Sequence, residues 1–286
     1  MPASRRSPKV SLQPSYMRVI ITGAAGRIGK EMVDELSGSH TVLLMDRRPV
    51  SGHPSIVADL SVTPGDSRWN RWWNFKACRW QEHFKGTDAV LHLAANPNPK
   101  APWEQVLRDN IQSTWNVMNA AVQYRVPRVV FASSNWAVKA LEQDLGPACY
   151  SPEGPKIGSE THPRPLTPYG VSKAMGEIIG RKFVDEKKLL AFVAVRIGSY
   201  RPTPPRDVVW RNLWIGSYDL RTLLRSCVER KIAGFHVVYG VSAQASAPYD
   251  LTHTCELLGW KPQEEMDSQS LQAAGGVVST VSCLET

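Results

Sequence analysis

The sequence predicts an α/β protein with a Rossmann-type, doubly wound parallel sheet and a small C-terminal substrate cap. Two observations predict this fold class. Short apolar runs, typical of buried strands, alternate along the chain with longer segments of helical periodicity. A glycine-rich turn joins the first apolar run to the first helical segment. Alternation of this kind is typical of a parallel sheet that carries helices on both faces.

The expected elements follow one another in a regular order. The expected strands lie at 18–22, 41–45, 89–93, 128–132 and 192–196. The expected helices between them lie at about 27–36, 103–124 and 168–187. Pro202, Pro204 and Pro205 then interrupt the chain, and a helix at 218–231 and a strand at 236–239 follow. We expect these last elements to form the cap over the carboxyl edge of the sheet.

One large domain is expected at 17–262, with a cofactor part at about 17–196 and a substrate cap at about 197–262. Residues 1–16 contain basic side chains but no apolar core of a secretory signal. We expect them to form a disordered arm, with an organelle-targeting peptide as the alternative. Residues 263–286 are expected to be a flexible tail. No apolar run reaches about 18 residues, so the sequence predicts no membrane span.

Charge and cysteine usage restrict the partners. The formal net charge is +8, and four of the basic residues lie near one end, namely Arg5, Arg6, Lys9 and Arg18. Because no basic stripe interleaved with aromatic residues accompanies them, we expect an anionic small molecule as partner and no nucleic acid. The five cysteines lack the spacing of a zinc site or of a disulfide framework. The sequence therefore predicts no metal and a reducing, cytoplasmic setting.

The segment 62–85 is rich in tryptophan and contains Trp69, Trp72, Trp73 and Trp80. Tryptophan is enriched at interface hot spots, so one interpretation is an interaction surface. We favour the other interpretation, a loop that folds back on the domain.

The first chemical motif is TGAAGRIG at 22–29, directly after a strand and at the start of a helix. Gly23 allows the tight turn, Gly26 lets a pyrophosphate approach the backbone, and Gly29 permits close helix packing. The amino end of the helix would face the phosphates. The motif therefore predicts a dinucleotide site, with glycines spaced as GxxGxxG rather than GxGxxG.

The second strand ends in Asp46, about twenty residues after the glycine turn. A carboxylate there can accept hydrogen bonds from the adenosine ribose and repels a 2′-phosphate, which favours NAD over NADP. Arg47 and Arg48 follow and could soften that preference. Further along the chain, two strand ends are expected to line the cofactor. Asp59 and Leu60 would lie beside the adenine, and Leu93, Ala94 and Ala95 would let the cofactor approach the backbone.

The stretch PYGVSK at 168–173 places Tyr169 and Lys173 one helical turn apart. A phenol has a pKa near 10, so a phenolate at neutral pH needs about 4 kcal/mol of differential stabilisation. Lys173 and a positively charged nicotinamide ring could supply it. Ser134, at the end of the fifth expected strand, would bond the substrate oxygen, and Asn110 would support the Lys173 region through water. The alternative is an ordinary tyrosine and lysine pair on an exposed helix.

Together these motifs resemble the extended short-chain dehydrogenase/reductase superfamily, with its TGxxGxxG, strand-ending Asp, HLAA and SS…YxxxK features. Within it, the segments VLHLAANPNPKAPWEQVLRDNI, RVVFASSNWAV, YGVSKAMGE, VRIGS and HVVYGVSA look like those of uronate dehydrogenases and of short-chain-type glucose-6-phosphate dehydrogenases. The resemblance covers about 17–262 and implies that Ser134, Tyr169 and Lys173 are catalytic. It also implies that the cofactor is contacted or supported by Gly23, Gly26, Arg27, Ile28, Gly29, Asp46, Asp59, Leu60 and Asn110.

The implied reaction is NAD-dependent oxidation of a sugar at its anomeric carbon, which gives an aldonolactone. Candidates for binding the sugar are Asn96, Asn135, Ser199 and the catalytic Ser134. In uronate dehydrogenases an arginine after VRIGS binds the sugar carboxylate as a bidentate pair. Arg211 is the nearest counterpart, one residue out of register, and Arg201 is the second candidate. Either would also bind a phosphate or a sulfonate.

Two other functions use the same motifs. A nucleotide-sugar epimerase or dehydratase holds NAD tightly, but it usually needs a larger cap than about 60 residues. A regulatory protein could bind NAD without catalysis, although it would not need Ser134, Tyr169 and Lys173 together. The superfamily resemblance also implies a homo-oligomer, most simply a dimer through the helices at 103–124 and 168–187.

Overall fold

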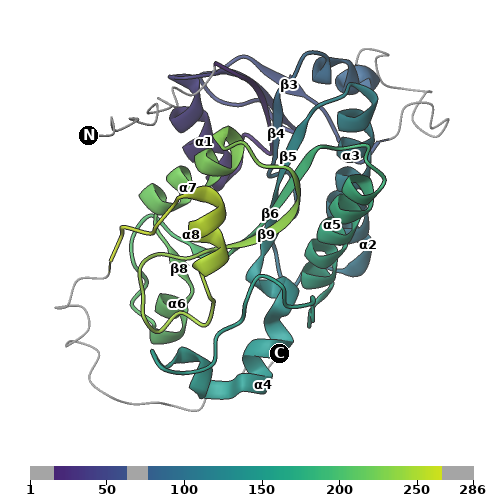
Figure 1. Ribbon diagram of the computed structural model, residues 1–286. Helices are drawn as coiled ribbons and strands as arrows, with labels where there is room; N and C mark the ends of the chain where they lie inside the picture. The colour runs from purple at the N-terminus through teal and green to yellow at the C-terminus, as the bar shows by residue number, and fades with distance from the viewer. Residues whose placement is uncertain (1–15, 63–76, 266–286) are drawn as a thin grey trace, which may run out of the picture.

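A seven-stranded parallel sheet forms the centre of the computed structural model, which describes residues 16–62 and 77–265 (Figure 1). The strand order is β3-β2-β1-β4-β5-β6-β9. The strands are β1 (Arg18–Thr22), β2 (Thr41–Asp46), β3 (Ser55–Val57), β4 (Ala89–His92), β5 (Arg128–Ser134), β6 (Ala191–Ile197) and β9 (Gly234–Gly240). The order reverses between β1 and β4, and such a switch point is where open α/β sheets bind ligands. The predicted fold class and the five predicted strands are confirmed.

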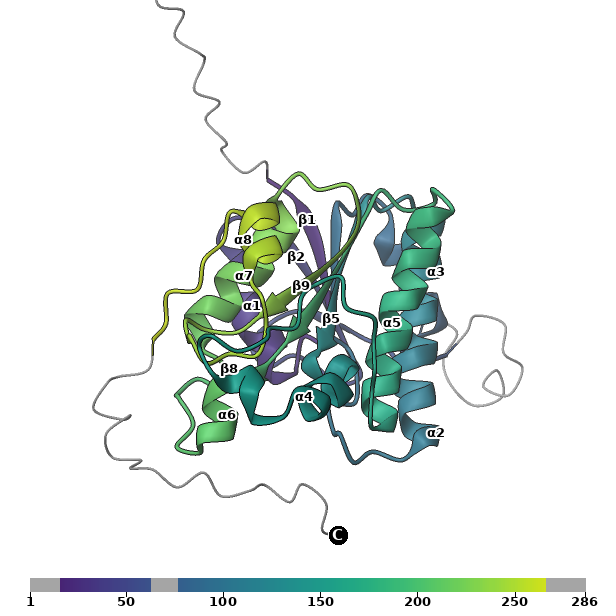
Figure 2. The same cartoon turned by 60° about the horizontal axis from the view of Figure 1, so that its bottom comes forward.

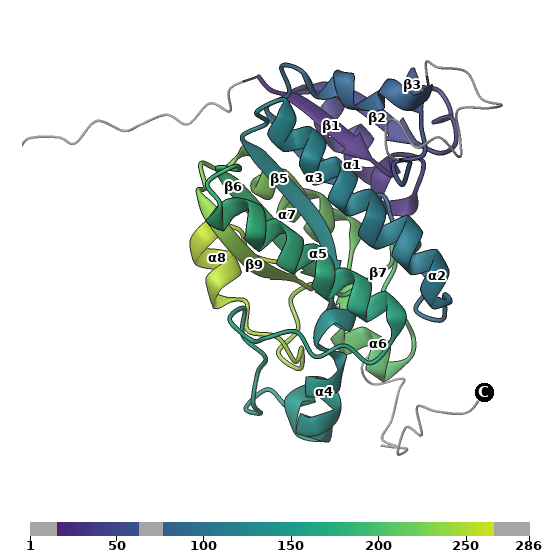
Figure 3. The same ribbon diagram turned by 90° about the vertical axis from the view of Figure 1, so that its right-hand side faces the viewer.

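Helices cover both faces of the sheet. Figure 2 shows α1, α7 and α8 on one side and α2, α3 and α5 on the other, and α3 lies beside α5 (Figure 3). Each layer has its own apolar core, because each helix turns one apolar stripe toward the strands. The helices are α1 (Arg27–Ser37), α2 (Trp103–Val106), α3 (Ser113–Gln123), α5 (Pro168–Asp185), α7 (Ser217–Glu229) and α8 (Thr252–Leu258). A π-helical turn, η2 (Leu107–Gln112), joins α2 to α3, so the expected helix at 103–124 is present in three parts.

The structure differs from the prediction at 218–239. Helix α7 packs on α1, where Arg221 forms an ion pair with Glu31 across a distance of 2.9 Å. Strand β9 pairs in parallel with β6 and closes that edge of the sheet. These two elements therefore extend the sheet and its helical layer rather than the cap.

The layer beyond the carboxyl ends of the strands comes from other segments. It contains α4 and α6, which lie together at one end of the molecule (Figures 1 and 2). Its elements are η3 (Asn135–Val138), α4 (Lys139–Leu145), η4 (Gly146–Tyr150), β7 (Ser199–Tyr200), α6 (Val208–Asn212) and β8 (Trp214–Ile215). Part of this layer follows β5, so the segment over the predicted site begins well before residue 197.

Helix α5 approaches the sheet more closely than ordinary side chains would permit. A Cβ atom on Gly176 would come within 2.2 Å of the Phe131 ring, and one on Gly180 within 2.3 Å of the Phe192 ring. The helix backbone therefore rests directly on aromatic rings of β5 and β6. This contact fixes the height of α5 above the strand ends.

Several expectations concern residues outside the described ones. Residues 1–15 of the arm predicted at 1–16, residues 266–286 of the tail predicted at 263–286, and Trp69, Trp72 and Trp73 fall there. Trp80 is described, as part of η1 (Ala77–Phe84), and it is buried against Phe84 with ring centroids 5.7 Å apart. Among the described residues, no helix combines the length and apolarity of a membrane span, and no cluster of three or more His, Cys, Asp or Glu side chains could hold a metal.

Candidate active site

A cavity of about 850 Å³ opens along the carboxyl ends of the central strands. Its wall comes from the glycine turn, the ends of β2, β4, β5 and β6, the start of α5, and residues 198–201. Most of the sequence-predicted residues line it, namely Gly23, Gly26, Arg27, Ile28, Gly29, Asp46, Leu60, Leu93, Ala94, Ala95, Asn96, Ser134, Asn135, Tyr169, Lys173, Ser199 and Arg201. Asp59, Asn110 and Arg211 lie outside this lining.

The glycine turn leaves no room for side chains. Gly23 has a φ of +72°, and a Cβ atom there would lie 2.6 Å from the backbone nitrogen of Ala94. A Cβ atom on Gly29 would lie 2.3 Å from the carbonyl oxygen of Gly23. Gly26 is the N-cap of α1, so the free amide groups of this helix end face the cavity. The turn is therefore shaped to let an anionic group approach the backbone.

Asp46 stands at the end of β2 beside this turn. Its carboxylate accepts hydrogen bonds from the backbone amides of Ala25 and Arg48, both at 3.0 Å. Asp59 does not line the cavity, and its carboxylate accepts hydrogen bonds from the amide and hydroxyl of Ser61 at 2.9 and 2.7 Å. It also pairs with Arg47, so Asp59 supports the wall rather than forming it.

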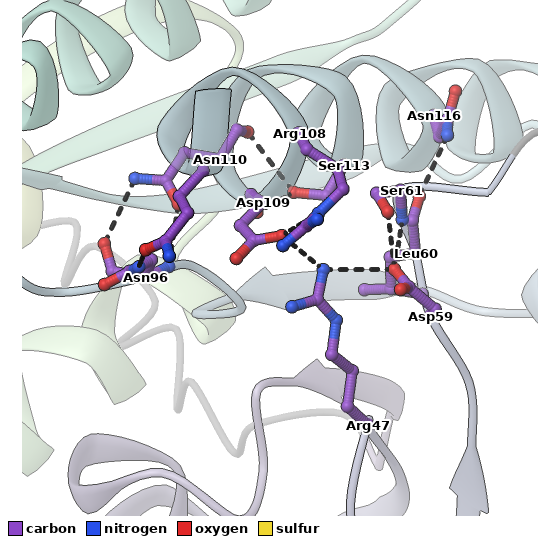
Figure 4. A network of polar contacts seen from close by, with 11 residues as sticks. Arg47, Asp59, Leu60, Ser61, Asn96, Arg108, Asp109, Asn110, Ser113 and Asn116 are labelled. Carbon is purple, nitrogen blue, oxygen red and sulfur yellow. Dashed lines mark hydrogen bonds and ion pairs between the residues drawn. The ribbon is translucent and has the colours of Figure 1, made fainter. Parts of the chain in front are cut away.

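Asn110 is buried in the π-helical turn and joins two segments of the site. Its Oδ1 accepts from the Asn96 amide at 2.7 Å, and its Nδ2 donates to the Asn96 carbonyl at 3.1 Å (Figure 4). Nδ2 also donates to Ser172 Oγ at 2.8 Å. The sequence prediction placed a water between Asn110 and the Lys173 region. The structure instead gives a direct hydrogen bond to the residue before Lys173.

Tyr169 and Lys173 project from the first turns of α5 toward the end of β5. Thr167 caps this helix, since its Oγ1 accepts from the Gly170 amide at 3.1 Å. Lys173 Nζ lies 5.5 Å from the centroid of the Tyr169 ring and donates to the Ala132 carbonyl at 2.8 Å. Tyr169 also shares a hydrogen bond with Ser134. The tyrosine, lysine and serine predicted to be catalytic therefore meet in one buried corner.

The electrostatics of this corner differ from the sequence-based expectation. Burial raises the pKa of Tyr169, and the hydrogen bond with Ser134 offsets this only in part. Burial also lowers the pKa of Lys173 to about 8. The protein's own groups thus raise the pKa of Tyr169, because burial destabilises the phenolate more than the one hydrogen bond from Ser134 stabilises it.

The buried ammonium of Lys173 predicts a stability cost at neutral pH. The folded chain gives up this proton near pH 8 and the unfolded chain near its usual 10.5, so the cost is complete below pH 8 and disappears as the pH rises toward 10.5. Lys173→Met is expected to raise the free energy of unfolding at pH 7 by about 1 to 3 kcal/mol, less so at pH 10. Urea denaturation at both pH values measures this.

Lys182→Met is the matched control, because Lys182 lies on the same helix with a side chain that is 43% exposed. It should change stability little at either pH. Lower stability of Lys173→Met at pH 7 would contradict the assigned cost.

Five of the six predicted sugar-binding residues line the same cavity, and Arg211 does not. Asn135 is buried and bonded to Ser134 and Tyr249, and Ser199 opens β7. The Arg201 guanidinium lies 5.6 Å from the centroid of the Trp210 ring, and both residues line the cavity. Arg211 is buried instead, and its Nε donates to the Pro205 carbonyl at 3.0 Å. Of the two candidate arginines, only Arg201 lines the cavity.

Sequence reasoning missed three aromatic residues of the wall, Trp136, Tyr200 and Trp210. Two of them adjoin predicted positions, since Trp136 follows Asn135 and Tyr200 follows Ser199. The position of these two residues directly after the SSN and VRIGS segments was the sequence signal that could have identified them. Aromatic faces beside a polar cluster are typical of small-molecule sites.

Several known proteins are similar to this chain in sequence and fold. Residues 19–200 match the NAD dependent epimerase/dehydratase family. An NAD-dependent glucose-6-phosphate dehydrogenase from Haloferax volcanii is 34% identical over 86% of this chain and 93% of its own. A uronate dehydrogenase from Agrobacterium fabrum is 30% identical over 88% and 86%. The crystal structure of uronate dehydrogenase from Agrobacterium tumefaciens superposes with a TM-score of 0.70, with 28% identity over 87% of this chain and 85% of that one. The chain belongs to the NAD dependent epimerase/dehydratase family.

Proposed function

We propose that this chain is an NAD-dependent sugar dehydrogenase that oxidises the anomeric carbon of an anionic sugar to the aldonolactone. The observation that carries the proposal is the meeting of Ser134, Tyr169 and Lys173 in a cavity that is also lined by the glycine turn and Asp46. The names of the relatives, glucose-6-phosphate dehydrogenase and uronate dehydrogenase, support the same class of substrate.

The residues present fit a dinucleotide. The turn at Gly23 and Gly29 is a cradle that any Cβ atom would fill, as a pyrophosphate against the backbone requires. Asp46 offers a carboxylate to ribose hydroxyls at one end. Lys173, which lines the same cavity beside Tyr169, would hold a second ribose. NAD, when bound, supplies the hydride acceptor.

The chain's own residues then handle the proton. Tyr169, as phenolate, accepts the proton of the C1 hydroxyl, while the C1 hydride leaves with its electron pair and a C1–O double bond forms. Ser134 donates a hydrogen bond to the same oxygen. The Lys173 ammonium favours the phenolate, and a bound oxidised nicotinamide would supply further positive charge against the cost of burial. Most of the remaining contribution is positioning.

We assign the anionic group of the sugar to Arg201 rather than to Arg211. Arg201→Ala is expected to raise KM for an anionic sugar by about 10- to 100-fold with a smaller change in kcat, because it removes a charge-assisted contact. Initial rates with varied sugar measure this. Arg201→Lys should keep part of the affinity, since it keeps the charge but not the fork of donors. A selective rise of KM in Arg211→Ala, with none in Arg201→Ala, would reverse the assignment.

A substrate panel followed by NADH absorbance tests the function itself. The panel contains uronates, phosphorylated aldoses, sulfonated sugars and neutral aldoses, and NADH is expected to accumulate with at least one anionic aldose. Conversion of a nucleotide sugar without net NADH would replace the proposal with an epimerase or dehydratase. Binding of NAD with no turnover of any sugar would favour the regulatory alternative.

The surface and the thiols support two further parts of the proposal. Trp115 on α3 and Ile178 on α5 expose 37% and 56% of their surface on the helix pair expected to form a dimer. We infer a homodimer through these helices.

Cys149, Cys227 and Cys255 are free thiols, which supports a reducing compartment such as the cytoplasm.

A further inference from the structure

Arg47 occupies a position that usually matters for the choice between NAD and NADP. It follows Asp46 directly and lines the cavity at the end that would hold the adenosine ribose. An arginine near this point can accommodate the 2′-phosphate of NADP. The sequence alone therefore leaves Arg47 as a residue that could weaken the selectivity set by Asp46.

The structure shows Arg47 already engaged by two carboxylates (Figure 4). Its Nη2 donates to Asp109 Oδ1 at 2.7 Å and to Asp59 Oδ1 at 3.1 Å. Asp59 follows β3, the neighbour of β2 in the sheet, and Asp109 lies in the π-helical turn. The guanidinium therefore connects the end of β2 to the segment after β3 and to this helical turn. Figure 4 shows the side chain extended between these partners.

The two partners are themselves held in place. The Asp59 carboxylate is fixed by the amide and hydroxyl of Ser61. The Asp109 side chain is only 10% exposed and accepts a second hydrogen bond, from Arg108 Nε at 2.8 Å. The hydrogen bond with Asp109 raises the pKa of Arg47, and the paired guanidinium groups hold the pKa of Asp109 low despite its burial. The charges of Arg47 and Asp109 therefore persist at physiological pH.

We propose that Asp59 and Asp109 select for NAD by holding Arg47 away from the 2′-position of the cofactor ribose. A 2′-phosphate would have to displace Arg47 from two carboxylates and would meet their negative charge together with that of Asp46. Selectivity for NAD over NADP thus depends on Arg47, whose charge is neutralised by its two carboxylate partners, as well as on Asp46, which repels a 2′-phosphate. Arg48 also lines the cavity, but within residues 16–62 and 77–265 its side chain has no carboxylate partner. Arg48 is therefore the control position for substitutions of Arg47.

The test measures binding rather than turnover. Isothermal titration calorimetry gives Kd for NADP and for NAD with the full chain and with Asp109→Asn, which frees Arg47 from its closer partner. The ratio of the two Kd values is expected to shift at least about tenfold toward NADP, since a charge-assisted contact becomes available. Adding Arg47→Ala should cancel the shift, whereas adding Arg48→Ala should leave it.

Two further variants make the result decisive. Asp59→Asn should shift the ratio in the same direction, and its side chain is 38% exposed, so it serves if Asp109→Asn does not fold. Asp185→Asn removes a carboxylate from an exposed pair on α5 and should leave the ratio unchanged. An unchanged ratio in folded Asp109→Asn or Asp59→Asn, or a shift that survives Arg47→Ala, would overturn the proposal. No sugar is needed, so failure here and failure of the substrate panel are separate outcomes.

Discussion

Tyr169→Phe is expected to lower kcat by at least about 1,000-fold while the Kd for NAD stays within about twofold. The substitution removes only the phenolic oxygen, which shares a hydrogen bond with Ser134, and leaves the ring that lines the cavity. Initial rates of NADH formation measure the loss, and calorimetric titration measures NAD affinity. A variant that binds NAD and turns over the sugar normally would remove Tyr169 as the base.

Tyr200→Phe is a matched control, because Tyr200 also lines the cavity but its hydroxyl donates to Glu31 at 2.6 Å, on α1. It should lower kcat far less than Tyr169→Phe. The pH profile adds a second readout. Because burial raises the pKa of Tyr169, the phenolate fraction, and with it kcat/KM, should rise as the pH increases from 6 to 9 in the native chain. The residual rate of Tyr169→Phe should lack this rise.

Arg196→Met is expected to lower the free energy of unfolding by about 3 to 5 kcal/mol, because it leaves a buried carboxylate without its partner. Arg196 is 1% exposed, and its Nε and Nη2 donate to the two carboxylate oxygens of Glu177 at 2.9 and 2.8 Å. Its Nη1 donates to Tyr239 Oη at 2.9 Å. Urea denaturation at pH 7 measures the loss.

Two comparisons test the cause. Arg181→Met breaks an exposed i,i+4 pair with Asp185 on α5, the helix that also carries Glu177. It should lower the free energy of unfolding by less than about 0.5 kcal/mol. Removing both charges, in Arg196→Met/Glu177→Leu, should recover much of the loss, since no unpaired charge remains buried. A loss below about 1 kcal/mol in Arg196→Met would show that Glu177 finds another partner or a proton.

This ion pair also bears on the site. Ser133 Oγ donates to Glu177 Oε1 at 2.6 Å, so Glu177 of α5 is tied to the residue before Ser134 on β5. Arg196 connects the same carboxylate to β6. Three elements that form the predicted catalytic corner are thus joined behind it. The stability loss in Arg196→Met should therefore be accompanied by a lower kcat.

Local patterns were enough to predict the central sheet and the glycine turn. Strand β1, the turn after it and helix α1 each depend on residues within one short stretch, and hydrophobic periodicity reports these directly. The strand at 236–239 was also predicted, but its position at the edge of the central sheet was not. Its pairing with β6 joins residues about forty positions apart, and an edge strand of the sheet has the same local pattern as a strand of a cap.

The parts of the site that escaped prediction depend on long-range neighbours. The upward shift in the pKa of Tyr169 follows from its burial in the folded chain, which no motif encodes. The difference between Arg201 and Arg211 follows from the path of the loop, which turns one guanidinium onto Trp210 and the other onto Pro205. The engagement of Arg47 needs Asp109, sixty-two positions away.

The seating of α5 on two aromatic rings has a consequence for how such a protein can change over time. Gly176 and Gly180 leave no slack beneath the helix, so Tyr169 cannot be moved without rebuilding Phe131 and Phe192 as well. The loop carrying Arg201 and Trp210 bears no such constraint from these rings. Changes in sugar preference should therefore come from substitutions in that loop, while the position of the base that serves the redox step is kept.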